Sequence, residues 1–463
     1  MPDKGQKLRA IPAMDIVLSY EWVQKWLESL GRMRVKRIIS RELSEIRRSI
    51  LEDDGEFSPD SFRDSCLSAL ASASRPMLRR VINATGVVIH TNLGRSLIAS
   101  EAVTAMSEIA AGYSNLEYDL KAGARGQRNS HIEDLLCALT GAESSFVVNN
   151  NAGAVMLTLS ALAKGSEVVV SRGELVEIGG SFRIPDIMEL SGATLHEVGT
   201  TNRTHLYDYE RAINDSTKML MKIHPSNFRI EGFTSAPERK ELSRLAKENG
   251  LIFMEDAGSG LLVDGAIIGL PPNTGEISIK ACLESGADIV TFSGDKILGG
   301  PQIGGIVGKK KFVDRLKKYP LARALRCDKV TLAGFEATLR LYAQGEYDSI
   351  PTLRMIRRNN DEMKSQAESL AGILREKVKA DIRVVETEDA TGGGSCPEIK
   401  LSGWGVAVKH ETYGAGYIQR LLRGLDIPIL CGARDDEIVI HVRTLKDSDI
   451  GEISAGLEGV MNA

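Results

Sequence analysis

Short β-rich runs alternate with helical stretches through the middle of the chain, and this alternation restricts the fold more than any other feature. The runs lie at 145–149, 167–171, 194–198, 218–223, 251–254 and 288–292, and residues 152–163 and 236–249 show helical character. Such alternation indicates an α/β domain built on a mostly parallel sheet. Ligands of these sheets bind beyond the carboxyl ends of the strands, so the residues that follow the strands are the candidates for chemistry.

Two of these strands lead to reactive side chains. The run 251–254 is followed by Asp256, and the run 288–292 by a glycine-flanked turn with Ser293, Asp295 and Lys296. A pyridoxal phosphate (PLP) enzyme needs a lysine that forms a Schiff base with the cofactor and a carboxylate that keeps its pyridine nitrogen protonated. An ion pair at about 4 Å is worth roughly 4 kcal/mol at an effective dielectric near 20, or about three pK units. We therefore predict that Lys296 and Asp256 are catalytic and bind PLP, although each alone could be a solvated lysine or a turn former.

A third strand, 145–149, runs into a helix through the sequence NNNAGAV at 149–155. Small residues at a helix start let backbone N–H groups reach a phosphate, and the helix dipole favours the negative charge. We predict that Asn151, Ala152 and Gly153 bind the cofactor phosphate and that Ser293 adds a hydrogen bond. Taken alone, the stretch is equally an ordinary helix cap.

The 463 residues divide into three expected parts. Residues 1–75 form a helical domain, with helices over 20–31, 35–51 and 61–73; residues 76–339 form the PLP-binding α/β domain; residues 340–463 form a small α+β domain. The last part begins with a helical run over 340–378. It continues with strands at 382–386, 398–401, 406–408 and 437–442 and with helices near 417–423 and 447–461.

The distribution of charge limits the possible partners. The net charge of −4 excludes a uniformly basic nucleic-acid binder, but residues 25–48 hold eight basic and three acidic side chains, a local charge of +5. The chain contains no run of 18 apolar residues and no signal-peptide pattern, so we expect no membrane association. The six cysteines form no C-x-x-C pair, which fits a cytoplasmic location without a disulfide frame or a cysteine-based zinc site, and we expect no metal.

Several longer motifs resemble one family, the bacterial selenocysteine synthases, which are PLP-dependent L-seryl-tRNA(Sec) selenium transferases. The motifs occur in order as LRAIP (8–12), INATG (82–86), HTNLGR (90–95), YSNLEYD (113–119), RGQR (125–128), GTTN (199–202), HPSNF (224–228) and the turn at 293–302. The resemblance covers nearly the whole chain. It implies the aminotransferase-like fold of PLP enzymes (fold type I), PLP as cofactor, and a dimer-based homo-oligomeric ring, commonly a decamer.

The resemblance also implies a reaction. Serine stays esterified to tRNA(Sec), Lys296 removes its α-proton, and Asp256 keeps the cofactor ring cationic. Asp295 is the candidate that protonates the departing hydroxyl, and selenium from selenophosphate adds to the dehydroalanyl intermediate. Arg95, Arg323 and Arg326 resemble the pocket for the selenophosphate anion, with the last two on one face of a helix over 321–329; Arg128 and residues 200–201 are further candidates.

The N-terminal basic stretch is the expected tRNA contact, because lysine and arginine bind phosphates without reading sequence. Its side chains are Arg32, Arg34, Lys36, Arg37 and Arg41. Without the resemblance, the sequence favours a solvated helix face for these cations and for those of 321–329. Two other functions stay open: a related PLP lyase acting on a small phosphorylated sugar acid, and a non-catalytic tRNA-binding assembly protein. Residues 1–75 argue against the lyase, which should not need a basic N-terminal domain. The Lys296–Asp256 pair argues against the non-catalytic assembly protein.

Overall fold

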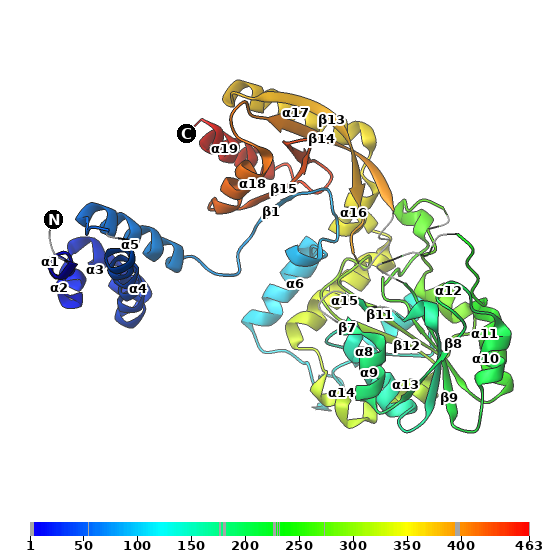
Figure 1. Cartoon of the computed structure of the whole chain (residues 1–463). Helices are drawn as coiled ribbons and strands as arrows, with labels where there is room; N and C mark the ends of the chain where they lie inside the picture. Colours follow the sequence, from blue (N-terminus) through cyan, green and yellow to red (C-terminus); the bar gives the residue numbers. More distant parts are fainter. Residues whose placement is uncertain are drawn as a thin grey trace. The chain divides into compact units, whose positions relative to one another are not determined.

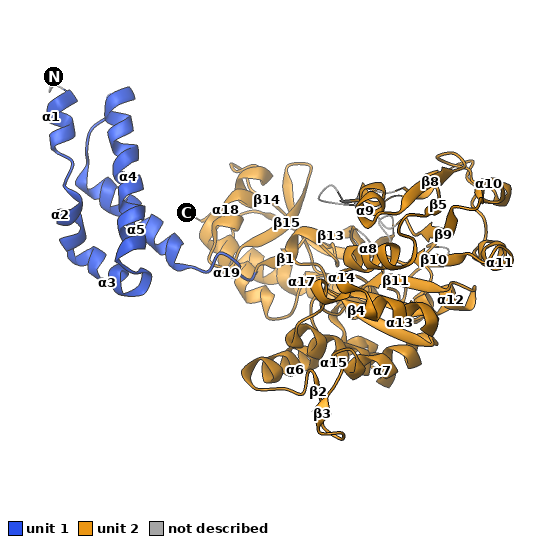
Figure 2. Ribbon diagram, turned by 90° about the horizontal axis from the view of Figure 1, so that it is seen from below, with its two compact units in different colours: residues 1–80 blue, residues 81–463 orange. Residues whose placement is uncertain are grey.

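A computed structural model describes residues 4–462 except 54, 176, 179–181, 226, 227, 229, 231, 273 and 394–398. Residue 398 of the strand expected at 398–401, and residues 226 and 227 of the motif at 224–228, lie outside the described residues. The chain divides into two compact units, residues 1–80 and residues 81–463, which Figure 2 distinguishes by colour.

The first unit is entirely helical within its described residues. Its helices are α1 (Lys4–Arg9), α2 (Met14–Ser19), α3 (Glu21–Leu30), α4 (Arg32–Glu52) and α5 (Pro59–Ser74). Helix α5 begins at Pro59, two residues before the predicted helix 61–73, because Ser58 caps it by accepting a hydrogen bond from the Ser61 backbone N–H and a proline occupies the first turn. Buried Val23, Ile39 and Phe62 belong to one core cluster that joins α3, α4 and α5.

A seven-stranded sheet forms the middle layer of the larger part of the second unit (Figure 1). Its strand order is β4 (Ser144–Val148), β12 (Gly304–Gly308), β11 (Ile289–Ser293), β10 (Ile252–Asp256), β9 (Thr217–Ile223), β5 (Glu167–Ser171) and β8 (Thr194–Val198). The neighbours from β11 to β8 pair in parallel, and only β12 runs antiparallel to both of its neighbours. The predicted α/β fold with a mostly parallel sheet is therefore confirmed.

Helices cover both faces of this sheet, which explains why its strands are almost continuously apolar. Strand β10 shows the alternation, because Ile252 and Met254 pack on one side of the sheet and Phe253 on the other. The first side carries α8 (Asn151–Leu162), α9 (Ile184–Ser191) and α13 (Lys310–Lys318). The second side carries α7 (Ser130–Thr140), α11 (Arg239–Glu248), α12 (Ile279–Glu284) and α15 (Lys329–Gln344).

A second, five-stranded sheet lies in the C-terminal part. Its order is β1 (Ile82–Ala84), β15 (Ile429–Arg434), β16 (Glu437–His441), β14 (Lys400–Lys409) and β13 (Asp381–Ala390). Helices α17 (Asn360–Lys377), α18 (Ala415–Gly424) and α19 (Asp449–Met461) pack on one of its faces. Strands β1 and β15 were not expected, and β1 pairs in parallel with β15 although more than 300 residues separate them in sequence. The N-terminal strand of the second unit thus completes the C-terminal sheet.

The helical run expected over 340–378 is interrupted in the structure, so that prediction is wrong in detail. Helix α15 ends at Gln344, where Gly345 adopts the left-handed conformation with φ +76°. Pro351 then opens the short helix α16 (Pro351–Arg357), and Asn359 caps α17. Apolar periodicity continues across these breaks, which is why the pattern alone predicts one long helix.

Candidate active site

The sheet brings the predicted lysine and aspartate to the same edge. Asp256 is the last residue of β10, and Lys296 follows the end of β11 in the next turn. The two strands are parallel neighbours with Asp256 opposite Thr291, so both side chains emerge at the carboxyl edge. Asp256 is 5% exposed and Lys296 is 6% exposed. Such burial is rare for charged residues unless they are paired or bound.

The polar side chains of the site lie close together beside Gly258. A Cβ atom placed on Gly258 would lie 3.8 Å from Lys296 Nζ, 3.9 Å from Asp256 Oδ1 and 4.0 Å from Asn151 Nδ2. The amine, the carboxylate and the amide therefore converge on one small volume beside a residue without a side chain.

Burial shifts the two titrating groups in opposite directions. Removal from water raises the pKa of Asp256, against the hydrogen bond from Asn151 and the charge of Lys296, which lower it. The same burial lowers the pKa of the Lys296 amine from 10.5, and the nearby charge of Asp256 opposes that shift. A buried amine with a lowered pKa is neutral more often at ordinary pH, and therefore nucleophilic, which is the property that a lysine needs to capture an aldehyde.

The turn before α8 contributes differently from the sequence-based prediction. The Asn151 side chain donates a hydrogen bond of 2.8 Å to Asp256 Oδ1. The Gly153 N–H donates to the side chain of Asn150, the helix cap, at 2.7 Å, so that N–H already has a partner. A Cβ on Gly153 would lie 3.1 Å from Asn149 Oδ1, which leaves little room for any side chain there. Ala152 follows Asn151 in the first turn, and Ser293, 6% exposed, ends β11.

Arg95 lies beside the lysine turn and pairs with Asp295. Arg95 Nη1 is 2.7 Å from Asp295 Oδ2, and Gln302 Nε2 donates to the same oxygen at 3.3 Å. Arg95 adopts a left-handed backbone with φ +64°, a conformation that costs a non-glycine residue energy and is more frequent at functional sites. The next residue, Ser96, donates its hydroxyl to the Lys296 carbonyl. The structure thus brings together a predicted anion ligand and the predicted proton donor.

Arg323 and Arg326 line a different cavity, of about 600 Å³, together with Arg125 and Arg128. Arg95 is not among its lining residues. The prediction of one helix over 321–329 is wrong. Helix α14 (Pro320–Ala324) ends one residue after Arg323, and Arg326 lies beyond it and forms a β-bridge with Val148. The two arginines nevertheless face one cavity, where Arg326 approaches Glu117 at 3.7 Å.

The N-terminal basic residues all lie on α4. Arg32, Arg34, Lys36, Arg37 and Arg41 are exposed, whereas Val35, Ile39 and Leu43 of the same helix are buried. Arg41 hydrogen-bonds Glu42 at 3.2 Å, so part of its charge is compensated. The helix therefore presents a cationic surface and anchors itself by its apolar side.

Sequence reasoning missed three contacts of Asp256. One is the amide of Asn151, which was expected to act through its backbone only. Thr291 donates its hydroxyl to Asp256 Oδ1 at 3.2 Å, and the backbone N–H of His224 donates to the Asp256 carbonyl at 3.0 Å. The imidazole of His224 donates through Nε2 to the Gly275 carbonyl at 3.2 Å. The position of His224 directly after the strand 218–223, at the start of the motif 224–228, is the signal that could have identified it.

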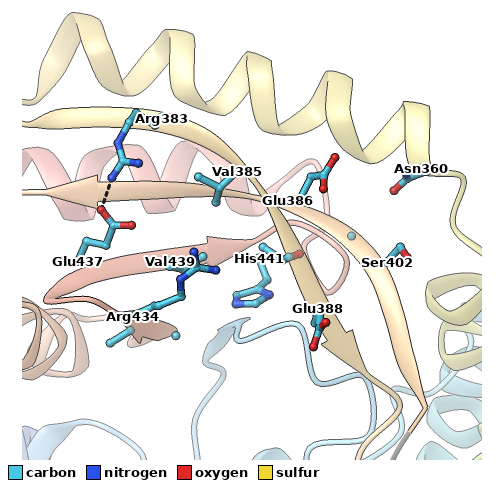
Figure 3. A pocket seen from close by; sticks show the side chains of 14 residues that line it. Asn360, Arg383, Val385, Glu386, Glu388, Ser402, Arg434, Glu437, Val439 and His441 are labelled. Carbon is cyan, nitrogen blue, oxygen red and sulfur yellow. Dashed lines mark hydrogen bonds and ion pairs between the residues drawn. The ribbon is translucent and has the colours of Figure 1, made fainter.

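Another cavity, of about 730 Å³, lies on the C-terminal sheet (Figure 3). The lining alternates in the first part of β13, where Arg383 and Val385 face the cavity whereas Ile382 and Val384 pack against the helices. Further along the strand, consecutive residues 385–388 all line the cavity. An ion pair joins Arg383 and Glu437, which both line this cavity. Neither Lys296 nor Asp256 contributes to this cavity, so it is separate from the candidate active site.

The buried groups at the carboxyl edge fit PLP. Lys296 supplies an amine of lowered pKa, Asp256 supplies a carboxylate fixed by two donors, and Asn151 Oδ1 is buried with no hydrogen-bond partner among the described residues. This set on a mostly parallel sheet with one antiparallel strand defines a PLP-dependent enzyme of the aminotransferase-like fold. No group of three or more potential metal ligands occurs in the described part of the chain.

Comparisons with known proteins identify the family. The family profile described as L-seryl-tRNA selenium transferase matches residues 81–446, and the profile described as selenocysteine synthase N terminal matches residues 8–47. The chain belongs to the L-seryl-tRNA selenium transferase family, as the resemblance of its motifs predicts.

Relatives match over almost their entire length. The L-seryl-tRNA(Sec) selenium transferase of Aquifex aeolicus (strain VF5) is 46% identical over 91% of this chain and 93% of its own. The enzyme of the same name from Desulfotalea psychrophila (strain LSv54 / DSM 12343) is 46% identical over 97% of both chains. Among solved structures, a D-glucosaminate-6-phosphate ammonia-lyase is similar with a TM-score of 0.57 and 22% identity, covering 83% of this chain and 96% of its own, and this similarity supports the fold alone. None of the described helices is both long and apolar enough to cross a membrane.

Proposed function

We propose that the protein converts L-seryl-tRNA(Sec) to L-selenocysteinyl-tRNA(Sec), with selenophosphate as the selenium donor. Membership of the family supports this reaction. The observation that carries it is the convergence of Lys296, Asp256 and Asn151 on one buried volume beside Gly258. Membership of this family also favours the proposed reaction over the two alternatives, a lyase acting on a phosphorylated sugar acid and a non-catalytic tRNA-binding assembly protein.

PLP, when bound, withdraws electrons from the α-carbon of an amino acid whose amine it carries. Lys296 would hold the cofactor, and its neutral Nζ would accept the α-proton of the seryl group, since burial favours the neutral amine. Asp256 would face the ring nitrogen. Its carboxylate is oriented for this task by donors from Asn151 and Thr291. Asn151 and Ala152 in the first turn of α8, together with Ser293, would bind the cofactor phosphate. Gly153 would contribute to this phosphate site because it has no side chain and leaves room in the turn.

Asp295 would donate a proton to the departing hydroxyl, because hydroxide leaves poorly without one. Arg95 and Gln302 hold its carboxyl group in place. Arg323 and Arg326 would bind selenophosphate, which suits the guanidinium fork. Arg95 would be a further ligand of the anion, although it lies outside their cavity and beside Asp295. The shared cavity of Arg323 and Arg326 supports their pairing, whereas the contact between Arg95 and Asp295 links the anion pocket to proton transfer.

Five exposed cations of α4 would bind the phosphate backbone of tRNA(Sec), with the small C-terminal domain assisting; they are Arg32, Arg34, Lys36, Arg37 and Arg41. We accordingly propose functional domains over 1–75 for tRNA binding, 76–339 for catalysis and 340–463 for the small domain.

We also propose a dimer-based ring, a decamer, as the assembly. Large apolar side chains are exposed between residues 97 and 120, which supports an interface there; they are Leu97, Val103, Tyr113, Tyr118 and Leu120. A cytoplasmic location is proposed because the described cysteines are all free.

The test is direct. The protein is incubated with seryl-tRNA(Sec) and selenophosphate, and the amino acid esterified to the tRNA is identified by mass spectrometry. Selenocysteine is expected, and it should disappear in the Lys296→Ala variant. If serine alone is recovered from the unaltered protein under conditions where the tRNA binds, the proposed reaction is wrong.

A further inference from the structure

A second cationic segment lies in the catalytic unit, and apart from Arg323 and Arg326 its basic side chains have no role so far. Residues 309–326 contain eight basic side chains and one acidic side chain, a formal charge of +7 in a protein whose net charge is −4. This segment comprises α13, α14 and the residues that lead to Arg326. So strong a local excess of one sign creates a potential that attracts a polyanion.

The cations of α13 fall into two groups. Lys310 and Lys317 are compensated, since Lys310 Nζ lies 3.2 Å from Asp314 and Lys317 Nζ lies 2.5 Å from Glu133. Lys311, Arg315 and Lys318 are exposed, and none has an acidic partner within the described part of the chain. Their spacing of four and three residues places them on one stripe of the helix. We name this set the α13 stripe.

The α13 stripe is fixed in direction by the packing of its helix. Val313 and Leu316 are fully buried in the core cluster that also contains α8. Arg315 Nη2 donates to the carbonyl of Ala161 near the end of α8 at 3.0 Å. The helix therefore presents the stripe to solvent on a rigid support.

The segment also leads to the active site. The carbonyl of Leu325 accepts a hydrogen bond of 2.8 Å from the Asn149 backbone N–H. Its side chain lies 3.2 Å from the position that a Cβ on Gly153 would occupy. Leu325 thus contacts the turn that carries Asn151, the partner of Asp256. A polyanionic strand such as RNA, bound along residues 309–326, would therefore reach the edge of the sheet at which Lys296 and Asp256 lie.

We propose that the α13 stripe binds the phosphate backbone of the RNA that carries the seryl group and directs its aminoacylated end towards Lys296. This rests on the proposed function, because an amino acid esterified to RNA reaches a buried amine only if the adjoining RNA is held outside the site. The contacts are with phosphates, so they add affinity and orientation but do not read sequence. The surface is separate from α4, which lies in the other compact unit.

A purely structural explanation makes a different prediction. Arg315 and Lys318 lie in the last turn of α13, where a cation interacts favourably with the helix dipole. If that is their only role, replacing them lowers the stability of the fold and leaves the salt dependence of RNA binding unchanged. Lys311 lies in the first turn, where the dipole disfavours a cation, so stability alone does not account for the whole stripe.

The experiment compares two triple variants of the full-length, PLP-loaded protein. The test variant carries Lys311→Gln, Arg315→Gln and Lys318→Gln. The control carries Lys240→Gln, Arg244→Gln and Lys247→Gln on α11, whose exposed cations lie among glutamates. The dissociation constant for seryl-tRNA(Sec) is measured over a range of salt concentrations, together with the thermal midpoint and the cofactor absorbance.

The test variant should bind roughly tenfold more weakly near 0.1 M salt, and its plot of log K against log salt should be less steep by about two units, since each phosphate contact contributes about 0.7–0.9. The control and the cofactor absorbance should be unchanged. A double variant, Lys311→Gln with Lys318→Gln, keeps the Arg315 bond to α8 and should show about two-thirds of the change in slope.

Unchanged affinity and slope in the test variant, or an equal loss in the α11 control, would overturn the proposal. So would normal RNA binding combined with a raised requirement for selenophosphate, which would mean that the stripe serves a small anion. These outcomes can be distinguished from a failure of the proposed function. If the proposed function is wrong, the unaltered protein itself leaves serine, and not selenocysteine, esterified to the tRNA.

Discussion

The amide of Asn151 and the carboxylate of Asp256 are joined by a hydrogen bond of 2.8 Å between residues that are far apart in sequence. Asn151 opens α8, and Asp256 closes β10. A hydrogen bond to a charged acceptor is worth about 1.5–3 kcal/mol. This contact therefore makes the orientation of Asp256 depend on the same turn that is proposed to bind the cofactor phosphate.

Replacing Asn151 by alanine should weaken PLP binding by about 10-fold to 100-fold, which corresponds to the loss of that hydrogen bond. Titration of the apoprotein with PLP, followed by absorbance, measures the effect. Thr291→Val, which removes the longer bond of 3.2 Å, should cause a smaller loss. Equal affinities for the unaltered protein and Asn151→Ala would show that Asp256 does not need this donor.

The rate at which the apoprotein captures PLP should rise with pH and level off below 10.5, the ordinary pKa of lysine, because burial lowers the pKa of Lys296 and only the neutral amine attacks. Asp256 opposes this shift, so Asp256→Asn should lower the pKa of Lys296 further and move the midpoint to lower pH. Stopped-flow absorbance gives the profile. A midpoint that moves upward in Asp256→Asn would contradict the assigned interaction between the two charges.

Neutralising Arg34, Arg37 and Arg41 with glutamine should weaken tRNA(Sec) binding and reduce its salt dependence by roughly two units, because three phosphate contacts are lost. Filter binding at several salt concentrations measures both quantities. Arg47→Gln with Arg48→Gln is the matched control, since these residues lie on the same helix and Arg48 pairs with Glu45. An identical loss in the control would mean that only the total charge of α4 matters.

Arg323→Ala combined with Arg326→Ala should reduce selenocysteine formation by at least about 100-fold while the α-proton of the seryl group still exchanges with deuterated water. The reason is that both arginines are assigned to selenophosphate and neither to Lys296, and a charge-assisted pair at each is worth about 1.5–3 kcal/mol. Mass spectrometry of the esterified amino acid follows both processes. Retention of full selenium transfer would show that the anion binds elsewhere.

Gly304→Ala should abolish or severely reduce PLP retention. A Cβ there would lie 2.0 Å from the Asn150 carbonyl oxygen, so the turn before α8 must move. Gly372→Ala in α17 is the control, because nothing lies within 4 Å of its added Cβ, and alanine should stabilise that helix by about 0.5–1 kcal/mol. Cofactor absorbance and thermal midpoints distinguish the two; unaltered retention in Gly304→Ala would contradict the described geometry.

The parts of this site that follow a strand could be predicted from sequence, because the end of a parallel strand fixes where the next side chain lies. Lys296 and Asp256 are of this kind. The contact between Asn151 and Asp256 could not be predicted, since it depends on the rotation of α8 against the sheet. The same is true of the pairing between Arg95 and Asp295, which depends on a left-handed turn.

The C-terminal sheet shows a similar limit. Local patterns indicate β13, β14 and β16, but β1 is only three residues long and takes its place through a pairing with distant β15. The break of the helical run at Gly345 and Pro351 is visible in the sequence, yet the apolar periodicity on either side conceals it. Long-range strand pairing and the ends of these helices could therefore be located only in the structure.

The central claim is that Lys296 holds PLP opposite Asp256. The most direct test is to load the protein with PLP, reduce it with borohydride, and locate the pyridoxyl group by peptide mass spectrometry. The account predicts one modified peptide that contains Lys296 and no modification in Lys296→Ala. A pyridoxyl group on a different lysine of the unaltered protein, or none at all, would contradict it.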